Sequence, residues 1–168
     1  MMNREIAQSL LQEFGDSMNV PGIALDASGC YPLSLGEGMT VFLQFRESAE
    51  DFLFAGTVGV LPTEEEEQAD VMRFLLISNL YGEDTDDATL SLEPEHNIVV
   101  LHRTWDPEGA DAQKFARALE SFAELLELWK KRYTEMLAES NDEVSPFEPI
   151  EDSLNAEASS QIDPSLFV

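Results

Sequence analysis

The chain has 168 residues, enough for one domain with its own core, and 43% of them are hydrophobic, which argues against global disorder. Its 34 acidic and 9 basic residues give a formal net charge of −25. That balance argues against nucleic acid and anionic membranes as partners, because both are bound mainly through Lys and Arg side chains.

The N-terminal third predicts one amphipathic helix followed by short strands. The helix is expected over residues 3–16, with Asn3 as its cap and Ile6, Leu10 and Phe14 recurring at four-residue steps. Turns rich in glycine separate the strands and favour an antiparallel meander. The expected strands are Cys30–Leu35, Met39–Arg46 and Phe52–Leu61, and Ile23–Asp26 is a brief further candidate.

A second helix is expected from Thr63 to about Tyr81. Thr63 and Glu66 have the spacing of a capping box, and Glu64–Glu66 would meet the positive end of the helix dipole. Its apolar arc is too broad for a helix with one side in water, which predicts a second burial surface, most simply another subunit. The arc consists of Val71, Met72, Phe74, Leu75, Leu76, Ile77 and Leu80.

The rest of the chain predicts two strands, a long helix and a tail. The strands are Thr89–Glu93 and Ile98–Trp105, and the helix starts at Asp106-Pro107 and runs to about Glu139. Residues 140–168 carry seven acids and no base, and we expect them to be disordered. The fold class is therefore an α+β domain over residues 1–139, with an antiparallel sheet of about five strands and three helices, in the order α-β-β-β-α-β-β-α.

Candidate catalytic and metal-binding residues are few. His96 and His102 lie in no recognisable motif, and Cys30 has no CxxC partner. The acids from Asp84 to Glu95 loosely resemble an EF-hand loop, but the glycine that such a loop requires is missing and a strand follows. We expect no enzyme activity, no metal and no cofactor.

Two further patterns bear on compartment and on strand geometry. A single cysteine excludes an intramolecular disulfide, and no apolar run reaches the roughly 20 residues of a membrane span. The N-terminus lacks the apolar core of a secretory signal, so we expect a cytoplasmic protein without membrane insertion. Gly56 and Gly59 lie inside a strand, where glycine marks a bulge or a close approach of backbones.

Several strings, in this order along the chain, are similar to those of a known family. The chain resembles the class I type III secretion chaperones, the Tir-chaperone family, over roughly residues 3–138, including a final helix with Phe122 and Trp129. The acidic tail is a departure from that family. The matching strings are Ile23-Ala-Leu-Asp26, Gly29-Cys-Tyr-Pro-Leu33, the strand from Phe52 to Pro62, Leu75-Leu-Ile-Ser-Asn-Leu80, Ala88-Thr-Leu-Ser-Leu-Glu93 and Val99-Val-Leu101.

The resemblance implies a bacterial cytoplasmic homodimer, paired mainly through the second helix and neighbouring strands, that takes part in virulence. It implies that the N-terminal chaperone-binding segment of a secreted effector wraps around the dimer in extended form. The segment adds backbone hydrogen bonds at a strand edge and places apolar side chains in patches. The effector is kept soluble and delivered to the secretion ATPase or sorting apparatus, without a nucleotide.

We predict two sets of binding residues and keep two alternatives open. One alternative is a regulatory adaptor or anti-activator of the same fold that binds a folded regulator. The other is a small-molecule enzyme, which requires a deep pocket with convergent polar groups. The predicted effector-binding residues are Ile6, Leu10, Phe14, Leu33, Leu35, Val41, Phe42, Leu43 and Phe45. The predicted dimer-interface residues are Val71, Phe74, Leu75, Ser78, Leu90 and Leu92.

Overall fold

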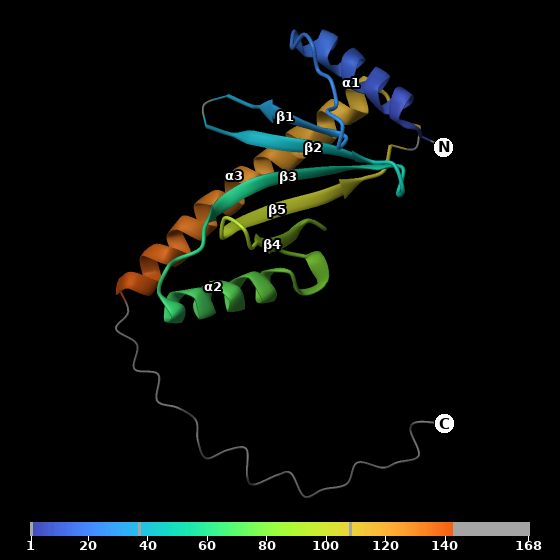
Figure 1. The fold of residues 1–168 in the computed structure, drawn as a ribbon. Helices are drawn as coiled ribbons and strands as arrows, with labels where there is room; N and C mark the ends of the chain where they lie inside the picture. The colour runs from blue at the N-terminus through green and yellow to red at the C-terminus, as the bar shows by residue number, and fades with distance from the viewer. Residues whose placement is uncertain (1, 37, 108, 143–168) are drawn as a thin grey trace, which may run out of the picture.

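The strands form one antiparallel sheet in the order β1-β2-β3-β5-β4, in a computed structural model that describes residues 2–36, 38–107 and 109–142 (Figure 1). Three helices accompany the sheet, and the predicted fold class and element order are confirmed. The strands are β1 (Cys30–Ser34), β2 (Thr40–Arg46), β3 (Asp51–Val60), β4 (Thr89–Glu93) and β5 (Ile98–Trp105). The helices are α1 (Arg4–Met18), α2 (Glu65–Ser78) and α3 (Ala112–Asp142), with a short 3₁₀ turn η1 (Leu80–Gly82) after α2.

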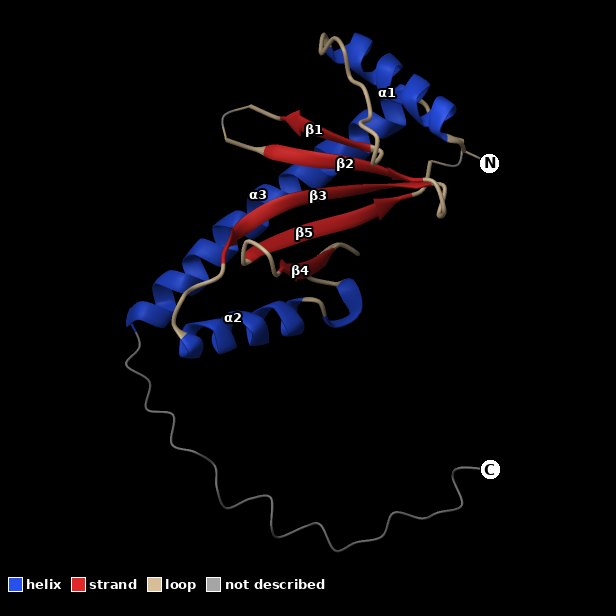
Figure 2. Cartoon of the chain, viewed as in Figure 1, coloured by secondary structure: helices blue, strands red, loops and turns tan. Residues whose placement is uncertain are grey.

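The sheet has one covered face and one open face. Successive residues of a strand point to opposite faces, and in β2 the side chains of Val41, Leu43 and Phe45 are buried. The intervening Thr40 and Phe42 are exposed. Figure 2 shows α3 crossing behind the sheet, α1 beyond β1 and α2 beside β4. Helix α3 therefore covers one face, with α1 packed against α3 at the β1 end, and the other face is open to solvent.

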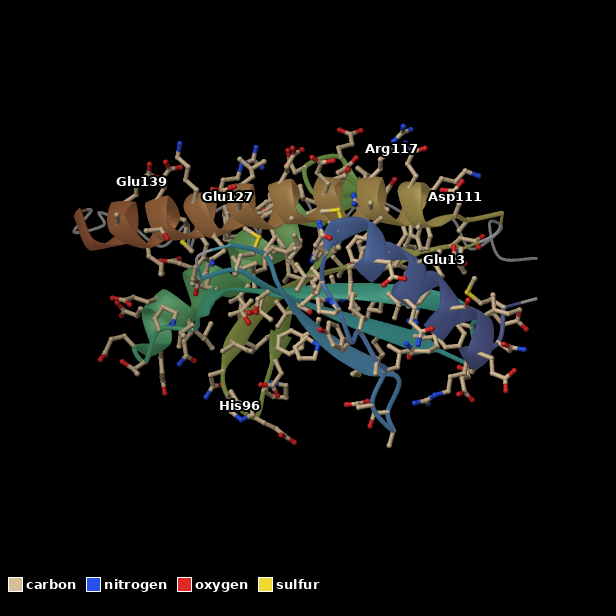
Figure 3. The ribbon with its side chains drawn as sticks, turned by 90° about the horizontal axis from the view of Figure 1, so that it is seen from above. Glu13, His96, Asp111, Arg117, Glu127 and Glu139 are labelled. Atoms are coloured by element: carbon tan, nitrogen blue, oxygen red, sulfur yellow. The ribbon has the colours of Figure 1, made fainter. Side chains whose placement is uncertain are left out.

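An aromatic cluster joins α3 to the covered face. The Phe115 ring lies 5.1 Å from that of Phe14, 5.4 Å from Phe52, 5.5 Å from Phe54 and 5.3 Å from Trp105, measured between centroids. All four contacts are edge-on, a geometry that adds roughly 0.5–1.5 kcal/mol per pair beyond the buried area. In Figure 3 the labelled Arg117, Glu127 and Glu139 project from the opposite side of α3, away from the sheet.

The glycines of β3 allow α3 to approach closely. A Cβ atom on Gly56 would lie 2.2 Å from Leu126 Cδ2, and one on Gly59 would lie 2.4 Å from Tyr133 Cε1. The pairing of β3 with β5 also shifts register between Thr57 and Gly59. The register shift agrees with the predicted bulge, whereas the close neighbours of the two glycines are side chains of α3 and not another backbone.

The brief strand candidate at residues 23–26 is wrong. Residues 23–26 form no strand, whereas the predicted Asn3 cap of α1 is confirmed by a 2.9 Å hydrogen bond from Ile6 N–H to Asn3 Oδ1. The side chain of Gln8 satisfies the backbone of this segment: its amide donates to Ile23 O at 2.7 Å, and its oxygen accepts from Leu25 N–H at 2.9 Å. A helix side chain thus replaces the neighbouring strand that the pattern required.

Two predicted helix starts are also wrong. Helix α2 begins at Glu65 without a side-chain cap, so the Thr63 capping box does not form. Instead, the Gln68 amide donates back to Pro62 O at 2.8 Å. Helix α3 begins after Asp111, whose carboxylate accepts a 2.8 Å hydrogen bond from Lys114 N–H, and not at Asp106-Pro107. At α3 a later polar side chain thus satisfies a first-turn N–H, whereas at α2 the Gln68 side chain bonds a carbonyl that precedes the helix.

The predicted tail lies almost wholly outside the described residues. Helix α3 continues to Asp142, three residues past its predicted end at Glu139. The boundary between domain and tail, and the disorder predicted for residues 140–168, therefore stay predictions.

Candidate protein-binding surfaces

Most of the predicted effector-binding residues lie in the core. Only Ile6 and Phe42 expose about half of their side chains, 48% and 49%. The half-buried one is Leu35, and the buried ones are Leu10, Phe14, Leu33, Val41, Leu43 and Phe45. In this conformation the buried six support the surface and have no free face of their own. Whether any of the nine contacts an effector stays a prediction.

The predicted dimer-interface residues occupy the inner side of α2 and the neighbouring strand. Phe74, which is half-buried, packs its ring 5.9 Å from that of Trp129 on α3. The others are the buried Val71, Leu75, Ser78 and Leu90 and the half-buried Leu92. These side chains are covered within a single chain, and their role in a dimer stays a prediction.

The opposite side of α2 and η1 is apolar and uncovered. We call this surface the outer α2 face; it consists of Met72, Leu76, Ile77, Leu80 and Tyr81, which are between 42% and 86% exposed. Five large apolar side chains on one short segment are more than scattered surface residues, and such patches mark protein contacts. The breadth of the apolar arc in the sequence signalled this surface, but the predicted interface residues were chosen from its inner side.

The open sheet face carries a fixed ion pair beside its exposed aromatic residue. Arg46 donates to both carboxylate oxygens of Asp51, at 2.7 and 2.6 Å, and to Thr104 Oγ1 at 3.2 Å. The hydrogen bond to Asp51 raises the pKa of the Arg46 guanidinium, so the positive charge persists. Phe42 lies on the same face of the same strand, four residue pairs further along the ladder.

Two titratable groups of the sheet, His102 and Cys30, have pKa values shifted toward their uncharged forms. Burial, reinforced by the positive charge of Arg46, lowers the pKa of His102. Burial, reinforced by the carboxylate of Asp26, raises the pKa of the Cys30 thiol. An activated thiol nucleophile needs the reverse shift, so Cys30 has the properties of a structural residue.

The β4 edge of the sheet is partly closed by a side chain. The Asn79 amide donates to Leu90 O at 2.8 Å, and its oxygen accepts from Leu90 N–H at 2.8 Å. Asn79 thereby occupies the position that a residue of a sixth strand would take. It also ties the C-terminal end of α2 to β4, and sequence reasoning missed it because nothing local distinguishes it from an ordinary helix-terminating asparagine.

The β1 edge is closed at one end and open at the other. Cys30 exchanges hydrogen bonds with Asp26, whose N–H donates to Cys30 O and whose Oδ1 accepts from Cys30 N–H, both at 2.9 Å. Pro32 has no N–H to offer. Because Leu35 N–H donates across the hairpin to Met39 O, alternation directs the N–H and C=O of Ser34 outward. Ser34 is therefore the part of this edge that can pair with an added strand.

In the part of the chain that the structure describes, one group of side chains has metal-ligand spacing, at the β4–β5 turn. Ligand atoms of Glu93, Glu95 and His96 lie within 4.8 Å of one another. The Glu93 carboxylate already accepts from Glu95 N–H at 2.8 Å and His96 N–H at 2.9 Å, and these bonds, that from Glu95 first, lower its pKa. Local turn geometry thus accounts for the cluster. In the EF-hand-like segment, Asp86 instead pairs with Arg103 at 3.0 Å.

A shallow cleft of about 640 Å³ lies beside the N-terminal end of α1. Met2 and Ile6 line its apolar side, and Glu50 and Asp51 are among its acids. Glu50 accepts a 3.0 Å hydrogen bond from Met2 N–H, and Asp51 is held by Arg46. These carboxylates are therefore committed to the fold, unlike the convergent free groups of an enzyme pocket.

Comparison with known proteins gives one family and several similar folds. Residues 9–130 match the model of the Tir chaperone protein (CesT) family. The Chlamydia pneumoniae protein CPj0713/CpB0740 is 28% identical over 123 residues, which cover 73% of this chain and 92% of that protein. None of the helices in the described residues is long and apolar enough to cross a membrane.

Three solved structures show the same fold at low sequence identity. A chain of the ExsC-ExsE complex aligns with a TM-score of 0.66 and 20% identity, covering 78% of this chain and 96% of its own length. A chain of the HopA1-SchA chaperone-effector complex gives 0.62 and 16%, with coverages of 76% and 95%. The structure of the Yersinia pestis type III secretion chaperone SycH with a fragment of YscM2 gives 0.54 and 16%, with coverages of 73% and 98%.

Proposed function

We propose that this chain, which belongs to the Tir chaperone protein (CesT) family, is a type III secretion chaperone for one or more secreted effectors. It binds the N-terminal chaperone-binding segment of the effector, keeps that segment extended and soluble, and presents the complex to the secretion ATPase or sorting apparatus. The observation that carries the proposal is the combination of a chaperone family with apolar surfaces that the described chain leaves uncovered.

Strand addition at β1 supports binding of an extended segment. The outward backbone groups of Ser34 offer hydrogen bonds that do not depend on the sequence of the bound chain. Phe42 lies on the neighbouring strand, paired with Pro32, and its exposed ring is available to an apolar side chain of that segment. Backbone pairing combined with a side-chain pocket suits a chaperone whose effectors differ in sequence.

A homodimer through the outer α2 face accounts for the second uncovered surface. A twofold interface brings the same patch of two copies together, so each apolar residue contributes buried area from both copies. Burying this face in a dimer leaves the β1 edge available to the effector, because β1 and β4 are the two opposite edge strands of the sheet. The net charge of −25 opposes association that is not specific and attracts basic effector segments.

The effector-binding part of the proposal is tested with two pairs of variants. Ser34→Pro removes the outward N–H, whereas Ser34→Ala keeps it; Phe42→Asp places a charge on the open face, whereas Phe42→Leu keeps an apolar side chain. Each first variant should lower capture of an effector N-terminal segment from the native cytosol by at least tenfold, with melting temperature and dimerisation unchanged. Equal capture by both members of a pair would remove that residue from the binding surface.

The state of the captured partner separates this function from the regulatory adaptor. Hydrogen exchange and limited proteolysis, followed by mass spectrometry, should locate protection in an extended N-terminal segment of the partner. Protection spread over a folded domain would favour the adaptor.

A further inference from the structure

Strands β2 and β3 diverge and leave a cleft in the sheet. Their ladder ends at the pair Phe42↔Ala55, although β2 begins at Thr40 and β3 continues to Val60 (Figure 1). The cleft between them measures about 470 Å³. It is lined on the sheet side by Met39, Phe42 and Val58, and on the helix side by Leu126 and Lys130.

Lys130 gives this cleft a positive charge. It is half-buried and also lines the adjoining cleft, together with Met39, Lys131 and the acids Glu127 and Glu135. Among the described residues Lys130 makes no ion pair, whereas Lys131 pairs with Glu135 at 3.8 Å and Arg132 lies 5.0 Å from the Trp129 ring centroid. A half-buried ammonium that forms no ion pair is unusual in a chain of charge −25, and it favours an occupant that carries an acid beside its apolar side chains.

The chain itself contains a segment of that chemistry. The 26 residues after Asp142 include six acids and no base. Their last seven, Ile162-Asp-Pro-Ser-Leu-Phe-Val168, differ from the rest because four are apolar and one is acidic. The strongly acidic stretch before them favours contact with water, whereas these seven residues have the composition that a partly apolar site beside one lysine would bind.

The length of the segment allows it to return to the cleft. At 1.5 Å per helical residue, Asp142 lies about 18 Å beyond Lys130 along α3. The residues between 142 and 162 span up to about 65 Å when extended, so more than twice the required length is present. The surplus makes closure of the loop a matter of a few kcal/mol of entropy.

We propose that Ile162–Val168 docks in the β2–β3 cleft of its own chain, with Leu166 and Phe167 against Met39 and Phe42, and with Asp163 paired to Lys130. The segment then covers an exposed aromatic residue of the open sheet face. On the function proposed above, an effector would have to displace it from Phe42. The docking itself does not depend on that function.

A spin label on the segment tests the docking without any effector. A nitroxide is attached at Ser165→Cys in a Cys30→Ser background, and methionine methyl resonances of the full chain are recorded with the label oxidised and reduced. The Met39 methyl signal should lose most of its intensity. Met2 should keep its intensity, because it is bonded to Glu50 beyond the opposite end of β2. An unaffected Met39 signal would overturn the proposal.

Matched variants and a mixing experiment identify the contacts and the occupant. Lys130→Glu should restore most of the Met39 intensity, whereas Lys131→Glu, which makes the same charge change one residue away, should not. If both substitutions restore the Met39 signal equally, the interaction depends on net charge and not on Lys130, and the proposed site is overturned. Signal loss that persists when nitroxide-labelled chains without isotope are mixed with unlabelled isotope-enriched chains would assign the cleft to a second copy, and would also overturn the proposal.

Discussion

Helices α2 and α3 are both rich in apolar residues, but they use them differently. In α3 the large apolar side chains follow one stripe, and Phe115, Phe122, Leu126 and Trp129 are almost completely buried against the rest of the chain. In α2 the apolar residues lie on two sides, and Leu76 is 73% exposed next to the buried Leu75. The stripe of α3 belongs to the fold, whereas half of the apolar surface of α2 stabilises nothing within the described chain.

The largest effect is expected from the inward stripe of α3. Phe122→Ala should lower the free energy of unfolding by about 3–5 kcal/mol, because it leaves a cavity under Phe54, whose ring centroid lies 5.9 Å away. Urea unfolding followed by circular dichroism measures this loss. Leu128→Ala, on the exposed side of the same helix, serves as the control and should cost less than about 1 kcal/mol. Equal costs would contradict the assignment of the two sides.

A substitution on the outer α2 face should weaken dimerisation and leave the unfolding free energy nearly unchanged. Leu76→Glu removes about 1.5–3 kcal/mol of burial from each copy, so the dissociation constant of the proposed dimer should rise by at least about 100-fold. Analytical ultracentrifugation checks this, and the unfolding of the monomer should be nearly unchanged. Gln12→Glu adds the same charge to the exposed side of α1 and should leave the dimer intact. A Leu76→Glu protein that remains dimeric would move the interface elsewhere.

Asn79 connects α2 to the sheet, and its removal should give an intermediate effect. Asn79→Ala leaves both backbone groups of Leu90 without their partner, which should cost about 1–3 kcal/mol of unfolding free energy. Hydrogen exchange should show faster exchange at Leu90 N–H in particular. Gln12→Ala, at an exposed helix position, is the matched control. Unchanged protection at Leu90 would show that α2 is held by its apolar contacts alone.

The smallest effect is expected from His102 of β5, through the pH dependence of the unfolding free energy. The pKa of His102 is lowered below its usual 6.5 in the folded protein. The His102 side chain therefore binds a proton more readily in the unfolded chain than in the folded one. Its contribution to stability is therefore present above about pH 6.5 and is lost as the pH falls through the lowered folded-state value. His102→Gln should reduce the loss of unfolding free energy between pH 7.5 and 5.5. An identical pH dependence of both proteins would exclude a role for this group.

Local sequence patterns predicted much of this fold. The bounds of β4 and β5 were predicted without error, and Phe122 and Trp129 of the predicted final helix are buried. The period-two alternation of apolar and polar residues in β2 also agrees with the structure, where Val41, Leu43 and Phe45 are buried and Phe42 is exposed. These features depend on residues close in sequence, because the pitch of a helix and the pleat of a strand are local properties.

Other features depend on contacts between distant segments, and only the tertiary structure decided them. Gln8 replaces a strand beside residues 23–25, and Asn79 closes the edge at Leu90, although neither pairing has a local signature. The two sides of α2 carry the same kinds of residue, so composition alone did not say which side would be covered. The sequence by itself determined which segments are helical, extended and apolar. The tertiary structure decided which apolar surface is left over, because burial depends on which elements pack together.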